Sequence, residues 1–218
     1  MAGEFAVIGL GQFGRSVATH LVREGNAVLA VDRNPERAQM VSEEVDAVMV
    51  ADATVEVALA ELGLERMTCV VVAMGMTAKE TSIMVTALLR QRGVPKIVSR
   101  AFDELHARVL LAVGAHEIVS PEDDMGARLA RHLSQPNVED EIVLGARDLL
   151  AAVHTPHALV GLAAHAQEVM PRFNVEILAV VRADTVITKD LAELRLQAGD
   201  RLLVLGDARA VRRFAALV

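Results

Sequence analysis

The sequence predicts an α/β protein with a Rossmann-like, doubly wound parallel sheet, followed by a small C-terminal α+β lobe. Through residues 1–133, short apolar runs of strand length alternate with helical patterns, and the connections between them are short. A glycine motif, G-x-G-x-x-G, directly follows the first of these runs. The alternation stops after residue 133, where further apolar runs indicate a second, smaller sheet.

The strands of the first lobe are predicted from runs that are apolar at nearly every residue, such as AVLAVD and CVVVAM. Such runs are typical of parallel strands that helices cover on both faces. Six strand–helix pairs favour the strand order 3-2-1-4-5-6. Strands are expected at residues 4–9, 27–32, 47–51, 69–73, 96–99 and 116–119, and helices at 13–25, 35–44, 55–63, 78–92, 103–113 and 121–133.

The second lobe follows a polar stretch, SQPNVEDE, that has no apolar periodicity. We interpret this stretch, residues 134–141, as a linker between a first lobe at 1–133 and a second at 142–218. A lobe of this size is small for a substrate-specific catalytic domain. Its strands are expected within 141–156, 175–190 and 200–207, and its helices at 159–169 and 208–218.

The composition excludes several classes of protein. A net charge of −7, the absence of a basic run and an aromatic content of 2% argue against nucleic acid as a partner. The apolar runs are too short to span a membrane, and the first residues lack the pattern of a secretory signal. A single cysteine fits a reducing compartment. We therefore expect a cytoplasmic protein.

The glycine motif predicts a nucleotide site. Gly9 would allow the tight turn, Gly11 the close approach of a pyrophosphate, and Gly14 the packing of helix on strand. The N–H groups of residues 12–14 would face the phosphates at the positive end of the helix. Asp32 ends the second strand, where a carboxylate can accept the ribose hydroxyls, and Arg33 follows it. The alternative is that the glycines only turn the chain and that Asp32 is a turn residue.

The residues of a redox site are harder to find. The chain has no tyrosine, and none of its three lysines has an obvious acid–base partner. No catalytic residue is predicted, although a small NAD(P)-dependent oxidoreductase stays open as an alternative. Ala73 ends the fourth predicted strand and Met74 follows it, so this methionine could line an adenine pocket or simply pack in the core.

Several segments together resemble the RCK (KTN) family, the cytosolic regulatory subunits of bacterial Ktr and Trk potassium uptake systems. They include FAVIGLGQFG, VLAVD, ADAT, VVVAMG, VSRA and LQAGDRLLVLGD. The most specific segment is GAHEIVSPEDDMG at residues 114–126. The resemblance covers nearly the whole chain.

This resemblance implies a regulatory subunit that need not catalyse a reaction. Members bind ATP, ADP or NAD(H) in the Rossmann-like lobe. They form dimers that close into an octameric ring, and the ring docks on a membrane ion-translocating subunit at the inner face of the cell membrane. We therefore expect a nucleotide-sensing protein that gates potassium transport and is not an enzyme.

The resemblance also implies roles for individual residues. Asp52 and Thr54 would border the adenine pocket, and Arg100 would reach a phosphate. Glu122 matches a glutamate that helps to build a divalent-cation site, for Mg²⁺ or Ca²⁺, between two subunits. Its alternative role is that of an acid in the first turn of a helix. The candidate ligand-binding residues are Gly9, Gly11, Gln12, Phe13, Gly14, Asp32, Arg33, Asp52, Ala53, Thr54, Ala73, Met74 and Arg100.

One residue departs from the family pattern. Gln12 occupies the position at which the related proteins usually carry an arginine that contacts the terminal phosphate. A glutamine donates a hydrogen bond but brings no charge, and charged hydrogen bonds are the stronger kind. The departure weakens the expected distinction between ATP and ADP and leaves room for NAD(H).

Overall fold

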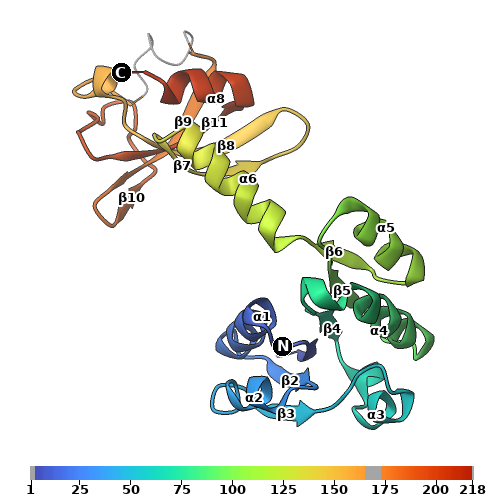
Figure 1. The fold of residues 1–218 in the computed structure, drawn as a ribbon. Helices are drawn as coiled ribbons and strands as arrows, with labels where there is room; N and C mark the ends of the chain where they lie inside the picture. Colours follow the sequence, from blue (N-terminus) through green and yellow to red (C-terminus); the bar gives the residue numbers. More distant parts are fainter. Residues whose placement is uncertain (1–2, 165–172, 218) are drawn as a thin grey trace. The chain divides into compact units, whose positions relative to one another are not determined.

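The computed structural model describes residues 3–164 and 173–217 and divides the chain into two units, Met1–Asp124 and Met125–Val218 (Figure 1). In the first unit the apolar runs form six parallel strands in the order β3-β2-β1-β4-β5-β6, which confirms the predicted sheet. The strands are β1 (Glu4–Ile8), β2 (Ala27–Asp32), β3 (Ala47–Val50), β4 (Cys69–Val72), β5 (Ile97–Arg100) and β6 (Glu117–Val119).

Six helices follow the strands of this sheet, close to where the sequence predicts them. The bounds are α1 (Gln12–Arg23), α2 (Pro35–Gln39), α3 (Glu56–Glu61), α4 (Lys79–Gln91), α5 (Glu104–Val113) and α6 (Pro121–Ser134). Short 3-10 turns, η1 (Leu64–Arg66) and η2 (Met76–Ala78), precede β4 and α4. The helix predicted at 35–44 was too long. It ends at Gln39, where the Ser42 hydroxyl donates to the Gln39 carbonyl and competes with the next helical turn.

Helices cover both faces of the sheet, as a doubly wound fold requires. Ala6 and Ile8 of β1 pack on one face with residues of α3 and α4. Val7, between them, points to the other face and packs with α1 and with Val41 and Val45 after α2. The carboxyl ends of all six strands therefore meet at one edge of the sheet, where open α/β sheets bind ligands.

The second unit holds an antiparallel sheet in the order β10-β9-β11-β8-β7. Phe214 and Val211 of the last helix are buried against residues of this sheet, which confirms a small α+β lobe. The elements are β7 (Val138–Val143), β8 (Asp148–His154), η3 (His157–Leu159), β9 (Val175–Arg182), β10 (Thr185–Ile187), β11 (Arg201–Asp207) and α8 (Ala208–Ala215).

The segment between the lobes differs from the predicted linker. α6 continues to Ser134, and β7 begins at Val138, within residues 134–141. The acidic residues of this polar stretch lie on an edge strand, where Asp140 pairs with Arg128 and Glu141 pairs with Arg131. Charged residues are common on edge strands because they discourage pairing with another chain. Polar composition therefore did not indicate a loop here.

The helix predicted at 159–169 is wrong over its first half. Gly161 adopts a left-handed φ of 85°. Its N–H donates to the Leu196 carbonyl, and the Ala164 N–H donates to that of Leu194. Backbone pairing with a distant segment therefore replaces the helical bonds, and the remainder of the predicted helix lies outside the described residues. Across the described part of the chain, no helix is long and apolar enough to cross a membrane.

Candidate nucleotide site

The turn between β1 and α1 explains two of the three motif glycines. Gly9 has a φ of 97°, a conformation that residues with a side chain rarely adopt. A Cβ on Gly14 would lie 1.8 Å from the Gly9 carbonyl oxygen, so the helix could not pack where it does. These two glycines are required by the fold alone, and they do not by themselves indicate a ligand.

Gly11 has a different environment. Its φ is −64°, which any residue can adopt, and a Cβ there would meet no protein atom within 4 Å. Gly75, which follows β4, has a φ of −78° and is equally free of neighbours. Both glycines line the same pocket. The structure therefore gives no packing reason for a glycine at either position, and both leave the pocket open.

This pocket lies at the carboxyl ends of β1 to β4, which include the point between β1 and β4 where the strand order reverses. It brings together residues that follow four different strands. Its lining consists of Ile8, Gly9, Gly11, Asp32, Arg33, Arg37, Ala51, Asp52, Ala53, Ala73, Met74, Gly75, Thr77, Ala78 and Thr81. Eight of the candidate residues thus gather at one site, namely Gly9, Gly11, Asp32, Arg33, Asp52, Ala53, Ala73 and Met74.

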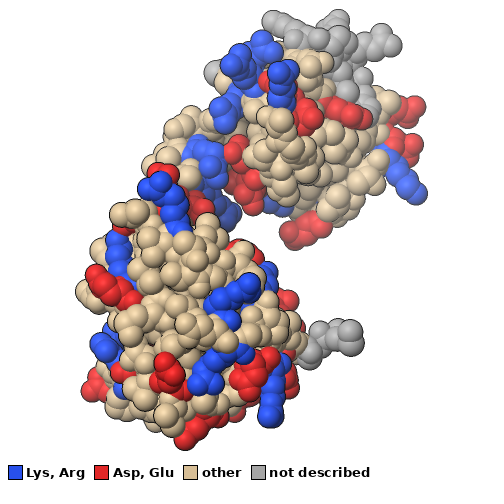
Figure 2. Space-filling view, turned by 90° about the vertical axis from the view of Figure 1, so that its right-hand side faces the viewer, with Lys and Arg blue, Asp and Glu red and all other residues tan. Residues whose placement is uncertain are grey.

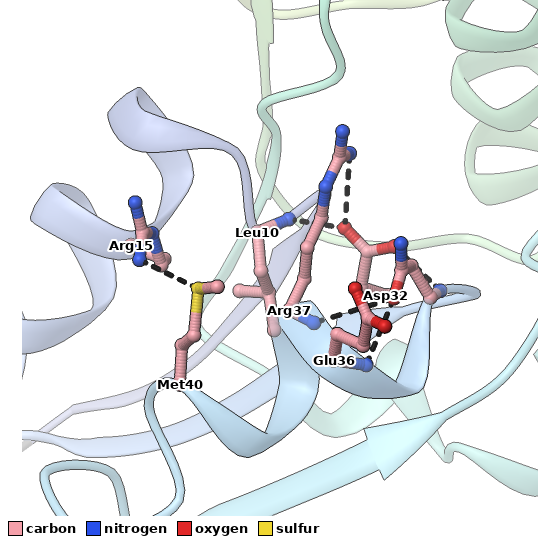
Figure 3. A network of polar contacts seen from close by, with 7 residues as sticks. Leu10, Arg15, Asp32, Glu36, Arg37 and Met40 are labelled. Atoms are coloured by element: carbon pink, nitrogen blue, oxygen red, sulfur yellow. Dashed lines mark hydrogen bonds and ion pairs between the residues drawn. The ribbon is translucent and has the colours of Figure 1, made fainter.

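Asp32 holds the glycine turn in place (Figure 3). Its side chain is 6% exposed. One carboxylate oxygen accepts a hydrogen bond of 2.7 Å from the Leu10 N–H, and the other accepts one of 2.8 Å from the Asn34 N–H. Each oxygen keeps a second lone pair, so the carboxylate can also accept hydroxyl hydrogens from a ribose. Asp32 is therefore both a part of the turn and a possible ligand contact.

Arg37 lines the pocket and was missed by sequence reasoning. Its Nη1 lies 3.8 Å from an Asp32 carboxylate oxygen, and both side chains appear in Figure 3. Arg37 is the third residue of α2, which begins with Pro35 after the Asn34 cap. A cap followed by proline fixes where the helix starts, so this signal could have placed Arg37 beside Asp32.

Asp52 and Thr54 form a small turn at the edge of the pocket. The Asp52 carboxylate accepts hydrogen bonds from the Thr54 hydroxyl at 2.7 Å and from its N–H at 3.0 Å. These bonds, with a smaller contribution from the charge of Arg33, lower the pKa of Asp52. Asp52 lines the pocket, whereas Thr54 is not among the lining residues. The two hydrogen bonds from Thr54 orient the Asp52 carboxylate.

Arg100 lies beside the first turn of α1 rather than in the pocket lining. The centre of its guanidinium group is 5.3 Å from the Phe13 ring and 4.8 Å from the Phe102 ring. It forms an ion pair with Glu122 in the first turn of α6. In all, the candidate residues that do not line the pocket are Gln12, Phe13, Gly14, Thr54, Arg100 and Glu122.

The structure does not bring a set of metal ligands to Glu122 within one chain. Its carboxylate contacts Arg100, and the described residues contain no group of three His, Cys, Asp or Glu side chains placed to hold a metal ion. A cation at Glu122 would therefore need ligands from a nucleotide or from a second chain. The metal role of Glu122 remains a prediction.

The six-stranded parallel sheet, the glycine turn and the separate antiparallel lobe define a two-lobe protein with a Rossmann-like nucleotide-binding fold. Family models match both lobes, the TrkA-N domain over residues 5–121 and the TrkA-C domain over residues 142–218. The chain belongs to the TrkA-N/TrkA-C family, the RCK family that the sequence resembles.

Among curated proteins, the chain is similar to the Ktr system potassium uptake protein C of Bacillus subtilis (strain 168). The two are 33% identical over 214 residues, which is 98% of this chain and 96% of that protein. This similarity extends over both lobes. The alignment therefore supports a common architecture for the whole chain.

Solved structures show the same fold. The crystal structure of the GsuK RCK domain superposes with a TM-score of 0.67 at 17% identity, over all of this chain and 48% of that one. GsuK bound to NAD superposes at 0.53 with 22% identity, over 97% and 38% of the two chains. GsuK bound to ADP superposes at 0.51 with 28% identity, over 60% and 33%. The chain thus spans half or less of these structures' length.

Proposed function

We propose that this protein is a nucleotide-sensing regulatory subunit that gates a membrane potassium transporter or channel through rearrangement of an RCK ring. The observation that carries the nucleotide site is Gly11, together with Gly75. Neither glycine is required by packing or backbone conformation, yet both line the pocket at the switch point of the sheet. A glycine that the fold does not need is explained by a ligand that approaches the backbone closely.

The ligand we propose is an adenine nucleotide, ATP or ADP, or the dinucleotide NAD(H). The N-terminus of α1 offers backbone N–H groups to phosphates, and Asp32 offers acceptors to a ribose. GsuK, one of the structures with the same fold, has been solved with ADP and with NAD. Gln12 supplies no charge to a terminal phosphate, so the site has no built-in preference for ATP at this position.

The protein is proposed to act as a dimer within an octameric ring. Met125, Leu129 and Leu133 lie at successive i, i+4 positions on α6, and all three side chains are exposed. A stripe of this kind on a helix is suited to contact with another subunit. The relative in Bacillus subtilis is a protein of a potassium uptake system. A membrane ion-translocating subunit is therefore the proposed partner, at the cytoplasmic face of the membrane.

The surface charge supports a protein partner over nucleic acid. On the face seen in Figure 2, lysine and arginine side chains are interspersed with aspartate and glutamate over the described residues. A protein that binds a phosphate backbone gathers its basic residues on one face or along one helix. The net charge of −7 also argues against binding to nucleic acid.

Gly11→Ala tests the nucleotide site. The new methyl group meets no protein atom, and replacing glycine by alanine before a helix costs under about 1 kcal/mol. The methyl group would instead obstruct the phosphates, which should weaken ADP binding by about ten- to a hundredfold. Isothermal titration calorimetry with ATP, ADP and NAD⁺ measures the change.

Gly126→Ala is the matched control. Gly126 lies in α6, and a Cβ there also meets no protein atom. This variant should bind every nucleotide as the wild type does. If Gly11→Ala and Gly126→Ala have equal affinities for all three nucleotides, the ligand does not approach Gly11 and the proposed site is wrong.

A further inference from the structure

The starting point is the unusual confinement of Arg100. Its side chain is only 14% exposed. The rings of Phe13 and Phe102 both lie within 5.3 Å of the centre of the guanidinium group, and cations are attracted to such ring faces. Its Nε is buried and has no hydrogen-bond partner among the described residues. The structure therefore holds this cation in place while leaving one of its donors unused.

The position of Phe13 connects Arg100 to the glycine turn. Phe13 is the second residue of α1, directly after Gln12, at the end of the helix that faces the proposed phosphates. Gln12 carries no charge. A cation that is held against Phe13 is therefore close to this helix end, where its charge can compensate a phosphate.

Glu122 is the counter-ion of Arg100 in this structure. Its carboxylate pairs with the Nη2 of Arg100 and its side chain is 62% exposed. A phosphate beside Arg100 would bring a second anion close to this carboxylate. The two anions repel each other, and both draw on the same cation. A phosphate in that position would therefore compete with Glu122 for Arg100.

We propose that Glu122 is a positioning residue that pairs with Arg100 in the ligand-free chain and is displaced by the nucleotide phosphate. This inference rests on the proposed function, because it assigns a competitor to the same site. Its consequence concerns α6. Glu122 lies in the first turn of α6, and the chain passes from the first unit into the second within this helix. Phosphate binding thus releases a bond between Arg100 at the end of β5 and the first turn of α6, both within the first unit.

The test compares Glu122→Gln with Asp123→Asn in the full-length protein. Both variants remove one negative charge from the first turn of α6, but only Glu122 pairs with Arg100. ADP is titrated by calorimetry in the presence of a chelator, so that no divalent cation contributes. Glu122→Gln should tighten ADP binding by about fivefold relative to Asp123→Asn, the range expected for an ion pair of this exposure.

A double-mutant cycle with Arg100→Gln makes the test specific. Arg100→Gln should weaken ADP binding, and the gain from Glu122→Gln should then be smaller than in the wild-type background, because only the repulsion between carboxylate and phosphate is left to relieve. Equal ADP affinities for Glu122→Gln and Asp123→Asn, or a weaker affinity for Glu122→Gln, would overturn the inference but not the nucleotide site. A wild-type chain that binds no adenine nucleotide would overturn both.

Discussion

At the scale of single residues, Asp32 shows how one side chain can serve both fold and site. Its two carboxylate oxygens accept hydrogen bonds from two backbone N–H groups, that of Leu10 in the glycine turn and that of Asn34 before α2. The acid at the end of the second strand was predicted as a ribose contact. The structure adds a role in the turn that no sequence motif records, since it depends on two backbone N–H groups that converge only in the folded chain.

Asp32→Ala should therefore weaken the fold as well as the site. Two hydrogen bonds to a buried carboxylate are lost, at roughly 1.5 kcal/mol each, so the free energy of unfolding should fall by about 3 kcal/mol. ADP affinity should fall too. Denaturation followed by circular dichroism measures the first effect and calorimetry the second.

Asp52→Ala is the control for this prediction. Asp52 lines the same pocket, but its bonds go to the neighbouring Thr54 at the surface. Its removal should change the free energy of unfolding by no more than about 0.5 kcal/mol. Equal losses of stability in Asp32→Ala and Asp52→Ala would show that the bonds from Leu10 and Asn34 do not stabilise the turn.

At the residue scale, the sequence indicated candidate site residues only where a motif has a fixed spacing. The glycine motif and its acid were found because their spacing is fixed by the turn and by the length of α1. Arg37 escaped because its place in the pocket depends on where a short helix begins. The pair of Arg100 and Glu122 was not predicted because Arg100 ends β5 and Glu122 lies in the first turn of a helix after β6, and sequence spacing does not indicate that they meet.

At the scale of elements, the parallel sheet could be predicted almost completely. Its strands are apolar on both faces, and each is followed by a helix. The apolar runs and the connections between them therefore both indicate a parallel sheet. The second unit was harder. The first residues of β7 were assigned to a linker because they are polar and lack apolar periodicity, and the segment around Gly161 was assigned to a helix. In both cases pairing with distant backbone decided the structure.

One ion pair ties the loop before β11 to β9 in the second unit. The Asp200 carboxylate is buried, and Arg182 donates to both of its oxygens at 2.8 Å. Arg182 also donates to the Arg195 carbonyl. The hydrogen bonds from Arg182 lower the pKa of Asp200. This pair therefore contributes stability only while Asp200 is charged.

Arg182→Ala should lower the melting temperature at pH 7 by about 5 °C or more, because it leaves a buried carboxylate without its partner. The folded state lowers the pKa of Asp200, so the stabilisation is complete above the unfolded value of about 4 and is lost as the pH falls below it. The difference between variant and wild type should therefore shrink on acidification. Thermal melts between pH 7 and pH 3 measure it.

Arg201→Ala is the control in the same unit. Arg201 pairs with Glu139, and both side chains are well exposed. Its loss should shift the melting temperature by less than about 2 °C at any pH, since exposed ion pairs contribute little. If the two arginine variants melt alike at pH 7, the buried pair does not stabilise the second unit.

At the scale of the whole molecule, the proposed regulation requires more than one chain. A ligand shifts an equilibrium only by its different affinities for two states, and a regulatory subunit conveys such a shift through contacts with other subunits. The exposed apolar stripe on α6 is the proposed contact. The i, i+4 spacing of its residues can be read from the sequence, but that spacing does not indicate that the stripe is exposed in the folded chain.

Leu129→Glu should shift the protein towards the monomer, because a charge in the middle of an apolar contact is costly to bury. Sedimentation velocity at micromolar concentration measures the change. Val186→Glu, at an exposed position on β10, introduces the same charge away from α6 and should leave the assembly intact. Equal assemblies in both variants would place the contact elsewhere.

Native mass spectrometry of the wild-type protein tests the proposed nucleotide-dependent assembly, because it counts chains and nucleotides in one particle. The protein is measured after removal of bound ligand and again after addition of ADP. We expect a dimer or a larger ring that takes up one nucleotide per chain. A monomer that takes up no nucleotide, with and without added ADP, would contradict it.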